Sequence, residues 1–133
     1  MRVHGDLRPG DPRLGALLAR TTVLAFPTEM DSFGYAALEA MASAVHVVAT
    51  RLNALPELVE DGVTGFLIDA DDRQLGDALL RVVEDPALHD RMAVAARRRV
   101  ATHFDAQSTT AQLVDLLFQA VASHHMPRLR AAG

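Results

Sequence analysis

The chain has no cysteine among its 133 residues, and no long apolar run. Without cysteine it has no disulfide, no zinc–thiolate site and no thiol nucleophile. The apolar runs fall well short of the ~20 residues that a membrane-spanning helix needs. Residues 1–6 do not have the pattern of a signal peptide. We therefore expect a soluble product of the cytoplasm with no transmembrane segment.

Net charge is also small: 13 basic and 17 acidic residues give a formal charge of −4 at pH 7. This balance argues against a general nucleic-acid or anionic-membrane partner. Apolar residues, by contrast, make up 50% of the chain, which is enough for a core. The length indicates one domain. We place it at residues 1–125 and expect a disordered tail at residues 126–133.

Short apolar runs alternate with helical patterns along the chain, which is typical of an α/β fold with a parallel sheet. The predicted strands are residues 3–5, 23–26, 45–50 and 65–68. The predicted helices are residues 12–20, a segment ending at about 43, 54–59, 72–84, 86–102 and 106–123. In the helix over 72–84 the residues expected to face inward are Leu75, Leu79, Val82 and Val83. We predict a partial Rossmann-like sheet of about four strands flanked by helices.

The most informative segment is residues 27–42, where a strand end, a tight turn and a helix start follow one another. Pro27 ends the strand because it has no N–H to donate. Ser32 is a candidate N-cap, and Gly34 is the residue type that lets a ligand approach the backbone closely. The first N–H groups of the helix lack intrahelical partners and lie at the positive end of its dipole. They form a ready site for a phosphate or sugar oxygen.

Two carboxylates, Asp31 and Glu39, flank this turn with seven residues between them. Glu39 lies five residues past Gly34, roughly 7–8 Å further along a helix. A ligand with an anion at the helix start could therefore reach Glu39 with a hydroxyl-bearing part, as a ribose behind a diphosphate does. The same spacing also fits an ordinary helix in which Asp31 supports the cap and Glu39 is a solvated charge.

The segment Asp31–Ala42 resembles the acidic-x7-Glu motif of retaining glycosyltransferases with the two-domain GT-B fold, especially the large family 4 group (glycosyl transferases group 1). The resemblance continues through residues 47–50, 54–59 and 61–68 in the family's order and spacing. It spans about residues 3–105 and begins midway through the family's C-terminal domain. It implies that the chain is the C-terminal, donor-binding part of such a fold.

The resemblance also implies a role for individual residues. Those assigned to the donor sugar and diphosphate are Asp31, Ser32, Phe33, Gly34 and Tyr35. Glu39, the second acid of the motif, is assigned to the ribose hydroxyls. The donor substrate would be a nucleotide sugar such as a UDP- or GDP-sugar, hexosyl transfer is implied, and no cofactor or metal is required.

The sequence departs from the family pattern at several positions. The first acid is Asp31, where Glu is commoner. Ala44 and His46 replace the usual Gly and Pro before the next strand, and Asn53 stands where Gly is frequent. If Ala44 adopts a positive φ, it carries a strain that Gly would avoid, whereas Asn tolerates left-handed turns better than most residues. These changes affect donor packing more than the fold.

The resemblance predicts functional parts that these 133 residues do not carry. The acceptor site would belong to an N-terminal domain or a partner chain. The family's basic pair at the diphosphate is usually an Arg and a Lys, and all thirteen basic residues here are Arg. We therefore assign no catalytic residue and expect the isolated chain to be inactive. The alternative is a non-catalytic nucleotide-binding or interaction module from a split or truncated gene.

Other residues carry weaker signals. Glu57 fits the family's donor cleft and equally fits the first turn of a short helix, where a carboxylate favours the dipole. The arginines at 97–99 point in different directions on a helix, which favours a solvated surface over a phosphate grip. His124 and His125 have no spaced third ligand for a metal. His46 is expected to be packed or edge-exposed rather than catalytic.

Overall fold

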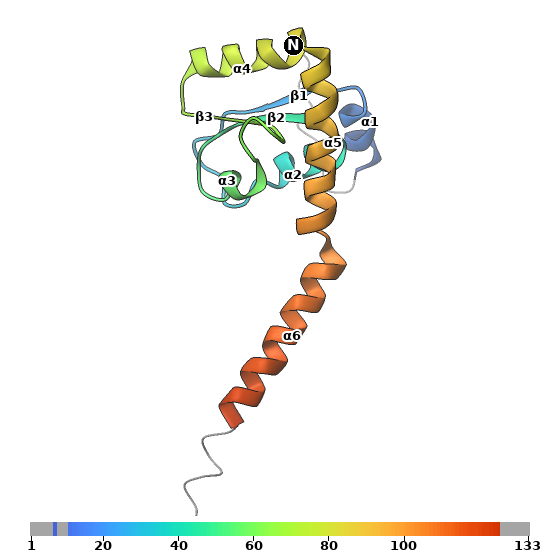
Figure 1. Cartoon of the computed structure of the whole chain (residues 1–133), viewed down its shortest axis with the longest axis vertical. Helices are drawn as coiled ribbons and strands as arrows, with labels where there is room; N and C mark the ends of the chain where they lie inside the picture. The colour runs from blue at the N-terminus through green and yellow to red at the C-terminus, as the bar shows by residue number, and fades with distance from the viewer. Residues whose placement is uncertain (1–6, 8–10, 126–133) are drawn as a thin grey trace, which may run out of the picture. The chain divides into compact units, whose positions relative to one another are not determined.

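The computed structural model describes residues 7 and 11–125. Its elements are α1 (Pro12–Leu18), β1 (Val23–Phe26), α2 (Tyr35–Ala42), β2 (His46–Thr50), α3 (Leu55–Leu58), β3 (Phe66–Ile68), α4 (Asp72–Glu84), α5 (Pro86–His103) and α6 (Ala106–His125) (Figure 1). The chain divides into two compact units, Met1–Val100 and Ala101–Gly133.

The first unit contains a three-stranded parallel sheet in the order β1-β2-β3. Val23 of β1 pairs with His46 of β2, and Val48 of β2 pairs with Phe66 of β3. Consecutive parallel strands need crossover connections, and α2 and α3 lie in these connections. The predicted α/β class and parallel sheet are confirmed. The fourth strand predicted at residues 3–5 lies outside the described residues, as does the tail predicted at residues 126–133.

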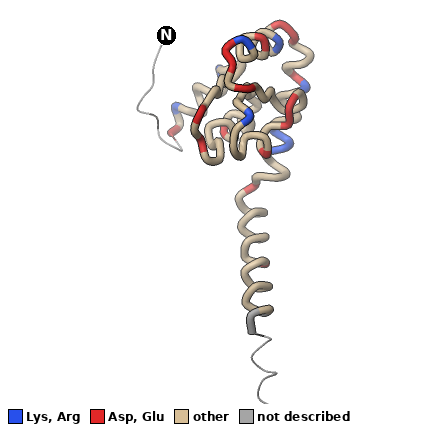
Figure 2. Tube along the Cα trace, turned by 90° about the vertical axis from the view of Figure 1, so that its left-hand side faces the viewer, with Lys and Arg blue, Asp and Glu red and all other residues tan. Residues whose placement is uncertain are grey.

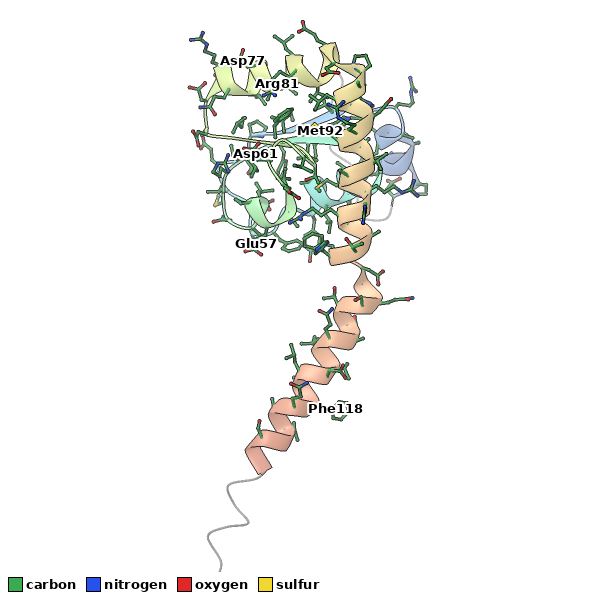
Figure 3. All side chains as sticks on the ribbon, in the orientation of Figure 1. Glu57, Asp61, Asp77, Arg81, Met92 and Phe118 are labelled. Atoms are coloured by element: carbon green, nitrogen blue, oxygen red, sulfur yellow. The ribbon has the colours of Figure 1, made fainter. Side chains whose placement is uncertain are left out.

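Helices cover both faces of this sheet. Figure 1 shows α4 above the strands and α2 and α3 below them. All five residues of the central strand β2 are buried, as expected for a strand covered on both faces. On the α4 side the core cluster consists of Val48, Phe66, Ile68, Ala78, Val82 and Met92. Met92 comes from α5 (Figure 3).

Helix α4 shows how the local sequence sets an element's bounds and its buried face. The Asp71 side chain accepts the N–H groups of Arg73 and Gln74 and so caps the helix start. The predicted inward position of Val83 is wrong, because this side chain is 62% exposed. Ala78 is buried instead, since it lies with the half-buried Leu75 on the i, i+3, i+4 stripe that faces the core.

The turn from α2 into β2 contains the strained residue that the sequence suggested. Ala44 has a φ of 59°, and Asn53 after β2 has a φ of 47°. The Ala44 N–H donates to Met41 O at 3.1 Å, and the Val45 N–H donates to Ala40 O at 2.9 Å. These two bonds close the end of α2 in the manner of a left-handed helix cap. Ala44 therefore bears a strain that glycine would avoid.

The second unit consists mainly of α6. The Asp105 side chain accepts the Ser108 N–H at 2.9 Å and caps the start of this helix. Among the residues that the structure describes, most charged ones lie in the first unit (Figure 2), whereas α6 carries Asp115 as its one Asp, Glu, Lys or Arg. Several of its apolar side chains are exposed, including Phe118 (Figure 3).

His46 is a buried polar side chain at the start of β2. Neither ring nitrogen has a hydrogen-bond partner. Its ring packs edge-on against His89 of α5, with 4.3 Å between the ring centroids. Burial lowers the pKa of His46, the neighbouring His89 lowers it further, and Asp90 acts in the opposite direction. The sequence left His46 either packed or edge-exposed, and the structure shows the packed alternative.

We expect the free energy of unfolding to fall as the pH drops below 6.5, the ordinary pKa of histidine. Below that pH, His46 binds a proton in the unfolded chain but stays neutral when it is buried in the folded chain. Acid therefore favours unfolding. His46→Leu should remove this part of the pH dependence. Leaving a buried polar group unpaired costs about 1–3 kcal/mol, so the variant should also gain stability of that order, most visibly at pH 5.5.

Urea denaturation at pH 5.5 and pH 8 measures both effects. The control is a substitution of the exposed His103, which should keep the wild-type change in the free energy of unfolding between the two pH values. If the free energy of unfolding of His46→Leu still changed with pH as much as that of the wild type, His46 would not be a source of the pH dependence.

Candidate functional site

The carboxyl ends of the three parallel strands lie at one edge of the sheet. The loops that leave this edge are residues 27–34 after β1, 51–54 after β2 and 69–71 after β3. In open parallel α/β sheets, ligands bind outside the carboxyl ends of the strands. The candidate site predicted from the sequence therefore begins at the edge where such sites occur.

The loop over residues 27–34 is fastened to the end of β2 by two hydrogen bonds. Thr50 Oγ1 donates to Thr28 O at 2.6 Å, and Asn53 Nδ2 donates to Asp31 O at 2.6 Å. Within the loop, Thr28 Oγ1 also accepts the Met30 N–H at 3.2 Å. Asn53 thus adopts the left-handed backbone that glycine would favour and adds an amide that holds the backbone of Asp31.

The cap of α2 differs from the prediction. Gly34, not Ser32, is the N-cap, with φ 88° and ψ 43° and no side-chain cap hydrogen bond. The Leu38 N–H donates to Gly34 O at 3.0 Å and makes the first intrahelical bond. Ser32 therefore lies two residues before the cap, with an exposed side chain.

Close packing explains why glycine occupies the cap. A Cβ on Gly34 would lie 2.7 Å from Leu55 Cδ2 and 3.0 Å from Leu58 Cδ1. Both leucines belong to α3 and are buried. Only glycine combines the left-handed φ with this close approach of the backbone to α3.

The start of α2 offers free backbone N–H groups. The amides of Tyr35, Ala36 and Ala37 precede the first bonded amide, so they have no intrahelical acceptor. The first turn of α2 contains no acidic residue that would repel an anion. The positive end of the helix dipole adds to these donors. This helix start can therefore bind a phosphate or another anion.

The structure brings most of the predicted site residues to this helix start. Asp31 and Phe33 are half-buried, and the rings of Phe33 and Tyr35 pack at 5.0 Å between centroids. Tyr35 and Glu39 are both exposed and lie one turn apart on the same face of α2. Glu57 lies in the first turn of α3, as one of its two interpretations stated (Figure 3).

The sequence interpretation missed Arg99. The prediction of a solvated surface holds for the exposed Arg97 and is wrong for Arg99, whose side chain bonds to the backbone of α3. A signal was present in the sequence: Met92, Ala96 and Arg99 follow the i, i+4, i+7 spacing of one helix face. Met92 and Ala96 are buried, so the side chain of Arg99 starts from the same packed face of the helix.

Within the residues that the structure describes, no group of three or more His, Asp or Glu side chains is placed to hold a metal ion. The side chains of His124 and His125 lie outside that description. None of the described helices is long and apolar enough to cross a membrane.

Comparison with known proteins gives consistent matches. Residues 1–85 match the family model described as "Glycosyl transferases group 1". The chain is 40% identical over 105 residues to D-inositol 3-phosphate glycosyltransferase from Nocardioides sp., covering 78% of this chain and 23% of the relative. It is 36% identical over 111 residues to alpha-maltose-1-phosphate synthase from Mycobacterium tuberculosis, covering 78% and 29%. The chain thus spans about a quarter of the length of these relatives.

Solved structures with the same arrangement are also found. A sucrose-phosphate synthase from Thermosynechococcus elongatus superposes with a TM-score of 0.76 at 28% identity, covering 84% of this chain and 28% of that one. HepE from Anabaena, solved in complex with UDP, gives a TM-score of 0.74 at 28% identity, covering 77% and 29%.

Proposed function

The chain belongs to the glycosyl transferases of group 1, and on this premise we propose that it forms the donor-binding part of an enzyme that transfers a sugar from a nucleotide sugar to an acceptor. We further propose that the transfer retains the anomeric configuration, as the acidic-x7-Glu motif implies. The observation that carries the proposal is the glycine-capped start of α2 at the carboxyl edge of the sheet, with Glu39 one turn further on.

In this proposal each part of the donor has its own contact. The diphosphate lies against the free amides at the start of α2, the sugar faces Asp31, and Glu39 accepts hydrogen bonds from the ribose hydroxyls. Tyr35 and Glu39 are separated by about 6 Å along the helix, a distance that a diphosphate and its ribose can span. HepE, which was solved with UDP, supports the choice of a nucleoside diphosphate as the ligand.

The chemical contribution of this part is electrostatic. Negative charge develops on the departing diphosphate when the sugar bond breaks, and preorganised N–H donors stabilise that charge. The hydrogen bonds from Thr50 and Asn53 keep the loop in place before the donor arrives. The acceptor would be held by an N-terminal domain or a partner chain. This agrees with the comparison, because the chain spans only about a quarter of the length of each relative.

We expect the 133 residues alone to bind nucleoside diphosphates and to transfer no sugar detectably. No lysine is present to share the diphosphate charge, and the acceptor has no partner to hold it in line. Each ~1.4 kcal/mol of lost stabilisation costs tenfold in rate, so losses of several kcal/mol abolish detectable turnover.

Calorimetry with UDP, GDP and ADP measures binding, and radiolabelled nucleotide sugars measure transfer by the same preparation. Turnover that disappears in Asp31→Ala and Glu39→Ala variants would contradict this division of labour. Absence of binding to every nucleoside diphosphate would contradict the donor site itself.

A further inference from the structure

Arg99 extends from α5 to the far end of α3. Its Nε donates to Leu58 O at 2.8 Å, and its Nη2 donates to Glu57 O at 2.7 Å. Its Nη1 lies 3.7 Å from Glu60 Oε2, just beyond the same helix. The Arg99 side chain is only 24% exposed, so these contacts are partly shielded from water.

The contacts matter because α3 is only four residues long. A helix of this length has no cooperative stability of its own, and its last carbonyls have no intrahelical partners. The planar guanidinium of Arg99 satisfies two of them at once, and hydrogen bonds from a charged donor are stronger than neutral ones. Arg99 therefore fixes the position of α3 against α5.

Helix α3 in turn supports the candidate donor site. Leu55 and Leu58 approach Gly34 so closely that a Cβ there would overlap Leu55 Cδ2 at 2.7 Å. Gly34 sets the left-handed cap from which α2 begins. A shift of α3 would therefore move the two leucines that pack against the Gly34 turn, and this turn sets the direction of the α2 amides.

We propose that Arg99 is a positioning residue for the donor site. It holds α3 in place, α3 holds the Gly34 turn, and that turn aims the free amides of α2 at the diphosphate. Arg99 acts through α3 rather than by contact with the donor. The part of this inference that concerns the diphosphate rests on the proposed function, whereas the mechanical link between Arg99 and Gly34 does not.

The test compares Arg99→Ala, Arg99→Lys and the control Arg97→Ala, which changes an exposed arginine on the same helix. All measurements are made where circular dichroism shows each variant fully folded. Amide hydrogen exchange follows Val59, bonded to Leu55 O, and Leu38, bonded to Gly34 O. Calorimetry gives the affinity for UDP, GDP and ADP.

We expect Arg99→Ala to speed exchange at both amides and to weaken nucleoside-diphosphate affinity about tenfold. Arg99→Lys, which keeps a charged donor, should fall between wild type and Arg99→Ala, and Arg97→Ala should match wild type. If Arg99→Ala does not fold, Arg99→Gln replaces it in the comparison. Exchange rates and affinity of Arg99→Lys that lie between those of the wild type and Arg99→Gln support the proposal, and values that do not lie between them overturn it.

Faster exchange at Val59 with no change at Leu38 would overturn the proposal, because Arg99 would then support α3 alone. Unchanged affinity together with faster exchange at Leu38 would also overturn it. If the wild type binds no nucleoside diphosphate, the proposed function fails. The Leu38 exchange rate then still decides whether Arg99 positions the Gly34 turn.

Discussion

Gly34→Ala is expected to lower the free energy of unfolding by about 2–5 kcal/mol and to weaken nucleoside-diphosphate binding at least tenfold. A left-handed φ costs an L-residue about 1–2 kcal/mol, and overpacking a buried site adds about 1–3 kcal/mol. Both terms apply because Gly34 has a φ of 88° and a Cβ there would meet Leu55 Cδ2 at 2.7 Å. Relief of the overlap would push the turn, and with it the α2 amides, away from α3.

Two other glycines separate these terms. Gly62 also has a positive φ, +76°, yet nothing lies within 4 Å of the position of an added Cβ. Gly62→Ala should therefore show the backbone strain alone. Gly76, inside α4, has neither constraint, and Gly76→Ala should be neutral or stabilising. Urea denaturation ranks the three variants, and equal losses for Gly34→Ala and Gly62→Ala would contradict the close packing on α3.

Glu39→Ala is expected to weaken nucleoside-diphosphate binding by about 1.5–3 kcal/mol, the strength of hydrogen bonds to a charged group. Because Glu39 is exposed, its removal should change the free energy of unfolding by no more than about 0.5 kcal/mol. The effect then belongs to binding and not to folding. The exposed Glu29, which lies in the loop before the cap, gives the control variant Glu29→Ala.

The ribose assignment has a sharper test in the ligand. Wild type should bind UDP more tightly than 2′-deoxy-UDP, and Glu39→Ala should lose this preference. Glu39 would instead be an ordinary solvated charge on the helix if Glu39→Ala kept the preference for UDP over 2′-deoxy-UDP. The same conclusion would follow if wild type and Glu39→Ala bound UDP equally well.

Most of the elements could be predicted because their signals are local. The bounds of β1 and α4 were predicted in full: an apolar run ends at Pro27, and acidic residues cap the helix at its start. The left-handed φ values of Ala44 and Asn53 also agree with the expectation from the family pattern. Such features depend on a few neighbouring residues, which the sequence displays directly.

The errors arise where a distant element decides the outcome. Ser32 has the right chemistry for a cap, but the leucines of α3 select Gly34 through close packing that no local pattern displays. Arg99 belongs to a run of three arginines, and although its helical spacing indicates the packed face, only the fold shows that it meets the carbonyls of α3. The residues concerned lie about 20 to 65 positions beyond Gly34 in the sequence.

The central claim is that a nucleoside diphosphate binds at the glycine-capped start of α2. Titration of the isotopically labelled chain with UDP and GDP, followed by amide chemical shifts, tests it most directly. We predict that the largest shifts fall on the amides of Gly34, Tyr35 and Ala36, with smaller ones at Glu39 and Asn53. Shifts confined to other elements, or no saturable shifts with either nucleotide, would contradict the account.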